Sequence, residues 1–327
     1  MGEMGKTPAP DDFGADDDIV TVFQLEGRPV RGRVVRLGST ADAVLSAHTY
    51  PASVAHLVGE AAMIAVLIGD SLKFQGKLIV QASGPGSEGR NVEGEGAVAF
   101  VVADFVPGEG VRAYAKYDAE RVKTLEKIHG GPVGAQMLLG GGHFAMTVDP
   151  GPGMERHQGV TSIQGESLAE AAEHYFDQSE QVPSRLKLVV GRQMIAGGTY
   201  VWRCGGALIQ RIAGDDARGE TDADFDHARA LFNTLETDEL IDPAITSGRL
   251  LFRLFHEEGV RVEQSRSVVR RCACEHDRLA RLLARFPSDD REHMSDDDGQ
   301  VAMTCEYCNR EWTFSAAEID QAGKAND

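Results

Sequence analysis

Four of the five cysteines lie close to the C-terminus, and their spacing restricts this chain more than any other feature. Cys272 and Cys274 form a C-x-C pair, and after thirty intervening residues Cys305 and Cys308 form a C-x-x-C pair. Two chelating pairs joined by a connecting segment are the usual sequence form of a four-thiolate zinc site. The sequence therefore predicts that one Zn²⁺ ion per chain binds these four cysteines while they are reduced.

The residues around the two pairs favour a small folded unit. A helix is expected after the first pair and a short hairpin around the second, from the spacing of Leu279, Leu282, Leu283, Val301, Met303, Trp312 and Phe314. About 55 residues bury little apolar surface, so the metal is expected to supply much of the folding free energy.

Two other interpretations of this region stay open at this point. The zinc site is a permanently closed structural module, or His276 replaces one cysteine as a ligand. The fifth cysteine, Cys204, stands alone among strand residues and is expected to be a buried, small apolar side chain.

The bulk composition is that of a globular protein with two or three domains. The chain has 327 residues, of which 42% are hydrophobic and 26% charged, so most of it is expected to bury a core. There are 33 Lys and Arg against 51 Asp and Glu, for a net charge of -18. Such a charge repels phosphate backbones and anionic lipids, which argues against nucleic-acid or membrane partners.

The sequence also bears on the compartment. Residues 1–18 are polar and acidic, without the apolar core of an export signal, and the apolar run 61–69 is too short to span a membrane. A cytoplasmic location is therefore expected. Structural disulfides are rare there, so paired cysteines more often bind metal or sense redox state.

The fold class expected from the hydrophobic pattern is α+β. It comprises a disordered acidic tail (1–17), a sheet-rich core domain (18–213), a helical linker (214–270) and a zinc-binding domain (271–327). Strands are expected at 19–25, 30–37, 143–148, 186–194 and 200–212 and repeatedly within 77–114, and helices at 41–48, 52–70 and 167–177.

The expected linker begins with the acidic, weakly apolar stretch 214–224 and continues as two modest helices. Their apolar residues are Phe225, Leu231, Phe232, Leu235, Leu250, Leu251, Leu254 and Phe255. Neither helix is long enough to be stable alone in water, so each needs a surface to pack on. The simplest interpretation of these side chains is ordinary helix core.

No enzyme motif emerges from the sequence, and the chain is not expected to be an enzyme. Leu78 follows Gly76-Lys77 where a phosphate-binding loop requires Ser or Thr, and Gly140–Gly142 lacks the dinucleotide-binding spacing. His256 has no second histidine at protease spacing, and the chain has no G-x-S-x-G motif.

Several segments together resemble one known family, the redox-regulated 33-kilodalton heat-shock chaperonins of bacteria. The matching segments are CACEHDRLARLL and VAMTCEYCNREWTF around the cysteines, 174–183 (HYFDQSEQVP), 158–160 with 165–167, and 205–210 (GGALIQ). The resemblance covers about residues 18–318. The acidic tail, Gly142, His143 and Cys204 depart from the family pattern, but none of them is a predicted zinc ligand.

The resemblance implies a chaperone that stores unfolding client proteins without ATP. It implies that the reduced, zinc-bound form is inactive and monomeric, and that oxidation forms the disulfides Cys272–Cys274 and Cys305–Cys308, releases zinc and unfolds the linker. Oxidised family members dimerise. Some apolar linker residues, with the core surface that they cover, would then bind clients.

Two other function classes remain as alternatives. A zinc-ribbon nucleic-acid-binding module would need a basic patch beside the metal, whereas Asp289, Asp290 and 296–298 offset the nearby arginines. A thiol–disulfide oxidoreductase would need a C-x-x-C motif with a low pKa at a helix N-terminus, and Glu306 is expected to raise the pKa of its neighbouring thiols.

Overall fold

The computed structural model describes residues 16–71, 76–85, 96–151, 153–212 and 221–324. The chain divides into two compact units, Met1–Arg270 and Arg271–Asp327. Most of the predicted acidic tail and most of the stretch 214–224 lie outside the described residues. Asp16 and Asp17, which the sequence assigned to that tail, are described and contact the folded unit.

The first sheet of the larger unit has six antiparallel strands in the order β10-β1-β2-β9-β8, with β11 also paired to β1. The strands are β1 (Ile19–Leu25), β2 (Val30–Leu37), β8 (Ser184–Met194), β9 (Tyr200–Arg211), β10 (Val260–Val262) and β11 (Arg266–Ser267). The predicted strands are confirmed, but β10 and β11 were missed. Both come from the region interpreted as a linker, which therefore completes one edge of the sheet.

The second sheet has five antiparallel strands in the order β5-β4-β3-β6-β7. They are β3 (Lys77–Ser83), β4 (Val98–Val106), β5 (Gly110–Tyr117), β6 (His143–Asp149) and β7 (His157–Ser162). The two sheets confirm a mixed fold with a sheet-rich N-terminal region.

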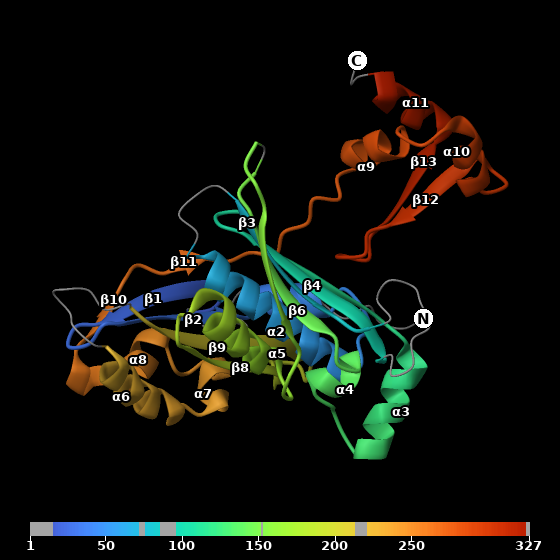
Figure 1. The fold of residues 1–327 in the computed structure, drawn as a ribbon. Coiled ribbons are helices and arrows are strands. Elements are labelled where there is room, and N and C mark those ends of the chain that lie inside the picture. Colours follow the sequence, from blue (N-terminus) through green and yellow to red (C-terminus); the bar gives the residue numbers. More distant parts are fainter. Residues whose placement is uncertain (1–15, 72–75, 86–95, 152, 213–220, 325–327) are drawn as a thin grey trace. The chain divides into compact units, whose positions relative to one another are not determined.

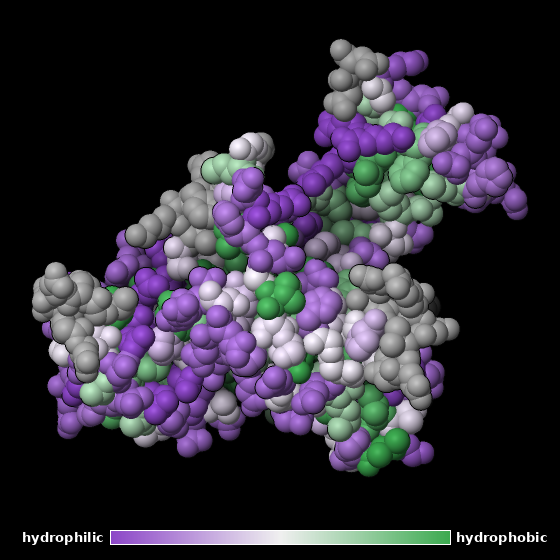
Figure 2. Space-filling model, in the orientation of Figure 1, coloured by the Kyte–Doolittle hydropathy of each residue, from purple (hydrophilic) through white to green (hydrophobic). Residues whose placement is uncertain are grey.

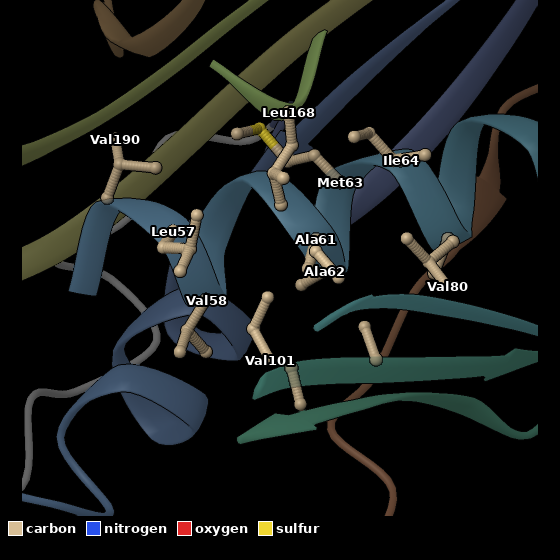
Figure 3. Close-up of a cluster of buried hydrophobic side chains, with 14 of the residues drawn as sticks. Leu57, Val58, Ala61, Ala62, Met63, Ile64, Val80, Val101, Leu168 and Val190 are labelled. Carbon is tan, nitrogen blue, oxygen red and sulfur yellow. The ribbon is translucent and has the colours of Figure 1, made fainter. Parts of the chain in front are cut away.

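Helix α2 (Ala52–Gly69) lies between the two sheets and forms the main core. In Figure 3, Val190 of β8 lies on one side of the helix, and Val80 of β3 and Val101 of β4 lie on the other. A helix buried on all sides can be apolar all round. Among the described residues α2 alone is long and apolar enough to cross a membrane, but 78% of it is buried inside the unit, as in a core helix.

Four shorter helices complete the part of the larger unit that precedes the linker. They are α1 (Ser39–Leu45), α3 (Ala119–His129), α4 (Ala135–Leu139) and α5 (Leu168–Tyr175), with the π-helical turn η2 (Phe176–Glu180) after α5. The sequence predicted α1 and α5 but not α3. That helix buries only Val122, so it has almost no apolar face to reveal it.

The linker helices cover the face of the first sheet opposite α2 (Figure 1). They are α6 (Asp222–Asn233), α7 (Thr237–Ile241), α8 (Ser247–Phe255) and the 3₁₀ turn η3 (His256–Glu258). Because successive residues of a strand point to opposite faces, Val34 packs with the linker helices, whereas Val35 packs with the α2 core. The first sheet is thus buried on both faces.

The smaller unit contains α9 (His276–Leu283), α10 (Ser288–Met294), β12 (Gln300–Thr304), β13 (Glu311–Ser315) and α11 (Ala316–Lys324). The predicted hairpin is confirmed, because Val301 pairs with Phe314 and Met303 pairs with Trp312. Among the described residues of this unit, the apolar core has five buried side chains: Ala280, Leu283, Val301, Phe314 and Ile319. So small a core gives little stability without a further constraint.

Gly32 in β2 provides a test of how closely the sheet and linker are packed. A Cβ at this position would lie 2.2 Å from Cζ of Phe23 and 2.6 Å from the carbonyl oxygen of Leu208. Phe23 stacks on Phe255 of the linker, with ring centroids 5.7 Å apart. We predict that Gly32→Ala displaces this ring and lowers the free energy of unfolding by about 1–3 kcal/mol, measured by urea denaturation.

Gly248→Ala is the matched control, because no atom lies within 4 Å of a Cβ built at this exposed position in α8. The control should unfold at the same urea concentration as the parent or slightly higher, since alanine favours helix. Equal midpoints for the two variants would contradict the close packing at Gly32.

Candidate metal centre

The four C-terminal cysteines place their sulfur atoms in one cluster. The Sγ atoms of Cys272, Cys274, Cys305 and Cys308 all lie within 4.8 Å of one another and could hold a metal ion. Three of the separations are 3.0 Å between Cys272 and Cys274, 3.3 Å between Cys274 and Cys308, and 3.7 Å between Cys272 and Cys305.

Local backbone structure explains how the two pairs reach one point. Cys305 and Cys308 lie in the turn between β12 and β13, which is closed by a hydrogen bond from N–H of Cys305 to the carbonyl of Arg310 (2.9 Å). N–H of Asn309 donates to the carbonyl of Cys305 (2.7 Å), and Asn309 has φ of 56°, a left-handed conformation that asparagine tolerates. The first pair lies just before α9, which packs on α11.

The geometry fits a tetrahedral metal better than disulfides. Four thiolates about 2.3 Å from a zinc ion lie roughly 3.8 Å from one another, close to the observed separations. A disulfide requires about 2.05 Å between sulfurs, and all five cysteines are free thiols here. The donor set is thus suited to a thiophilic ion.

The charge state of the cluster also depends on a cation. Burial raises the pKa of the thiols of Cys272, Cys274 and Cys308. Burial also acts against ionisation of Cys305, but hydrogen bonds involving the backbone of Cys308 and Tyr307 outweigh it, so the pKa of Cys305 is lowered. Glu306 is not among the causes of the pKa shifts of Cys305 and Cys308, so the expectation that it raises the pKa of these thiols stays a prediction. A bound cation would favour the thiolate form of all four sulfurs.

His276, the alternative ligand, does not join the sulfur cluster. Its ring lies against the hairpin, with its centroid 4.6 Å from that of Phe314 and 5.8 Å from that of Trp312. The cluster of sulfurs is complete without it. Cys204, by contrast, is buried in the larger unit, where desolvation raises the pKa of its thiol.

Comparison with known proteins identifies the family. The family model described as "Hsp33 protein" matches residues 18–315. A protein of Caulobacter vibrioides named "33 kDa chaperonin" is 48% identical over 299 residues, covering 91% of this chain and 95% of its own length. The chain belongs to the Hsp33 family. A relative in Serratia proteamaculans with the same name is 32% identical and covers 91% of this chain and 92% of its own length.

A solved structure supports the fold of this Hsp33 family member. The 33 kDa chaperonin of Thermotoga maritima superposes with a TM-score of 0.74, covering 94% of this chain and 99% of its own. With 20% identity, that likeness bears on the fold alone. The resemblance found in the sequence is confirmed by these comparisons.

The structure gathers the eight predicted linker residues in one apolar cluster. Seven are buried and Leu231 is partly buried, all packed with residues of the first sheet, namely Phe23, Leu25, Val30, Val34, Ala207 and Ile209. The visible face over α6 and α8 is mostly hydrophilic in Figure 2, consistent with apolar side chains that point inward. Their packing surface is the sheet of the larger unit.

Sequence reasoning did not identify the sheet residues under the linker as part of this surface. A usable signal was present in β9, where residues 204–209 (CGGALI) carry no polar side chain on either set of alternating positions. Such a run indicates a strand covered on two faces. The sequence analysis also missed Arg36 and Arg203. These two arginines are buried under the linker and donate hydrogen bonds to its backbone carbonyls.

Replacement of one cysteine tests the metal centre. We predict that Cys308→Ser weakens zinc binding more than about a hundredfold, because serine offers no thiolate. Amide hydrogen exchange should then accelerate throughout 271–324, because the small apolar core of this unit depends on the metal. Cys204→Ala is the control, and it should keep the metal content of the parent. Retention of one tightly bound ion by Cys308→Ser would exclude a four-cysteine site.

Proposed function

We propose that this chain is a redox-regulated, ATP-independent chaperone that prevents aggregation of unfolding proteins. It is inactive while reduced and zinc-bound, and active after oxidation. We place it in the cytoplasm, as a monomer when reduced and a homodimer when oxidised. The observation that carries the proposal is the single cluster of four sulfurs in a member of the Hsp33 family, whose curated relatives are named 33 kDa chaperonin.

Zinc, when bound, keeps the four sulfurs deprotonated and joins the two halves of the small unit. Cys272 and Cys274 come from the segment before α9, and Cys305 and Cys308 from the β12–β13 turn. Thiolates held in this way remain nucleophiles that are open to oxidants, since each of the four residues is only partly buried.

Oxidation by hypochlorous acid is balanced within each pair. One thiolate attacks chlorine and releases hydroxide, and the second thiolate then displaces chloride to form the disulfide. Each pair thereby passes two electrons to one oxidant molecule. The proposed pairs are Cys272–Cys274 and Cys305–Cys308.

Which cysteines form disulfides decides whether oxidation destabilises the small unit. Disulfides within each pair leave the two halves of the unit unconnected, so its small core loses its main constraint. Disulfides between the pairs would instead join the halves, and the sulfurs of Cys274 and Cys308 also lie close enough for that alternative. Oxidation can therefore release the linker only if Cys272 bonds to Cys274 and Cys305 bonds to Cys308.

We infer that loss of the small unit destabilises the linker that leads into it. The linker helices bury apolar side chains against the first sheet, so their release would expose both sides of that contact. Two complementary apolar surfaces of this kind suit unfolding proteins, which expose apolar segments without a common sequence.

A paired measurement tests the switch. Hypochlorous acid is added to the reduced protein, zinc release is followed with a chromogenic chelator, and the same samples are tested for suppression of aggregation of a chemically unfolded protein. We expect zinc release and activity to rise together, at about two oxidant molecules per zinc, and to reverse with a thiol reductant. Activity that does not change on oxidation would return the four cysteines to a structural role.

Peptide mapping of the same samples decides the pairing. Active protein should contain Cys272–Cys274 and Cys305–Cys308. Active protein that contains Cys274–Cys308 instead would contradict the release mechanism, although not the chaperone activity.

Substitution of two phenylalanines of α8 tests linker release in the reduced protein, without oxidation. Phe255 is 1% exposed within the linker cluster, whereas Phe252 is 64% exposed on the same helix. We predict that Phe255→Ala destabilises linker packing by about 3–5 kcal/mol and makes the reduced protein suppress aggregation. Phe252→Ala should behave as the parent, with zinc retained in both variants. A reduced Phe255→Ala protein whose linker is digested by protease but which does not suppress aggregation would argue against linker release as the activating step.

The acidity of the small unit supports protein clients over nucleic acid. Residues 271–327 contain seven Lys and Arg and thirteen Asp and Glu. Arg310 stacks on Trp312 with 4.0 Å between the guanidinium carbon and the ring centroid, and Arg291 pairs with Asp320. Neither arrangement forms the basic patch that phosphate binding requires.

A further inference from the structure

Two arginines are buried beneath the linker, on the first sheet. Arg36 of β2 is 1% exposed and Arg203 of β9 is 2% exposed, and both are among the largest fully buried side chains of the described residues. Arg36 donates to the carbonyls of Asp242 (2.5 Å) and Ile245 (2.5 Å), and Arg203 donates to the carbonyl of Ile241 (2.9 Å). The two guanidinium groups therefore hold the C-terminal end of α7 and the loop before α8.

A carboxylate from the N-terminal end of the described chain neutralises part of this buried charge. Asp17, whose side chain is 3% exposed, pairs with Arg203 and lies 3.9 Å from Nε of Arg36. Two cations in a largely dry site repel each other, and a buried charge that loses its partner is costly. Among the described residues, no other carboxylate forms an ion pair with either arginine.

The residues on either side of Asp17 extend this contact across the linker. Asp16 accepts a hydrogen bond from N–H of Ser247, the first residue of α8. The Asp18 carboxylate accepts a hydrogen bond from N–H of Thr40 (2.9 Å) at the start of α1. The backbone carbonyl of Asp18 accepts a hydrogen bond from N–H of Val268 (2.8 Å). Residues 16–18 thus connect the start of α8 and the end of the linker to the core domain.

We propose that Asp16–Asp18 acts as a strap that holds the linker on the first sheet and sets how readily it is released. The three aspartates contact the linker at 247 and 268 and, through the arginines, at 241–245. The strap is independent of the four cysteines, because it acts in the larger unit. Its consequence for activity depends on the proposed function, but its effect on linker opening does not.

Asp17→Asn tests the strap in the full-length, reduced, zinc-loaded protein. The substitution removes the charge and keeps the shape, so the two buried arginines lose their counter-ion. We expect amide hydrogen exchange in 237–258 to accelerate about a hundredfold relative to the parent. Exchange in 271–324 and the zinc content should not change. The hypochlorous acid concentration needed for half-maximal suppression of aggregation should fall.

Asp104→Asn is the matched control. Asp104 of β4 has a side chain that is 4% exposed and pairs with Arg112 at 2.7 Å, but it lies in the second sheet and not beneath the linker helices α6–α8. This variant also breaks a buried ion pair, so it reports the general cost of such a change. It should lower the stability of the larger unit without selective exchange in 237–258.

The outcomes separate the strap from the proposed function. Equal exchange of 237–258 in both variants, or no acceleration in Asp17→Asn, overturns the strap. Selective opening by Asp17→Asn without any gain in suppression of aggregation keeps the strap and counts against linker release as the activating step. If Asp17→Asn fails to fold, Asp16→Ala takes its place, because it removes the acceptor of Ser247 N–H and leaves the ion pair of Asp17 with Arg203 in place. It should accelerate exchange at the start of α8, and unchanged exchange there would equally overturn the strap.

Discussion

The packing of α6–α8 on the first sheet is the contact on which the proposed function depends. A sheet that is apolar on one face needs one covering layer, whereas this sheet is apolar on both. Helix α2 and the second sheet cover one face permanently. The other face is covered by three short helices, none of which is stable alone. The protein therefore contains a large apolar surface whose cover contributes little stability of its own.

The small unit, in contrast, has little apolar packing and four sulfurs that could bind a metal. Its core has five buried side chains, and the four sulfurs supply the stronger constraint once a metal joins them. The stability of this unit would therefore depend on bonds between sulfur and metal more than on packing, and those bonds lie at one end of the chain.

Much of this organisation could be predicted from sequence, because it depends on local patterns. The cysteine spacing predicted the cluster of four sulfurs, and alternation around Val301 and Phe314 predicted the hairpin. Strands β10 and β11 were missed because they are short and exposed, and their partner β1 lies more than two hundred residues away. Long-range pairing of this kind leaves no periodic signal in a single sequence.

Buried charges distinguish the contact between the linker and the first sheet from a purely apolar contact. Apolar packing alone would favour closure whatever the surroundings, but here the closed form also requires two guanidinium groups to be buried. Desolvation lowers the pKa of Arg36, which shows that burial opposes its charge, and Asp17 acts in the other direction. A buried ion pair contributes little net stability when complete and destabilises strongly when broken. A closure built in this way changes steeply when one partner moves, which a purely apolar contact of the same area would not do.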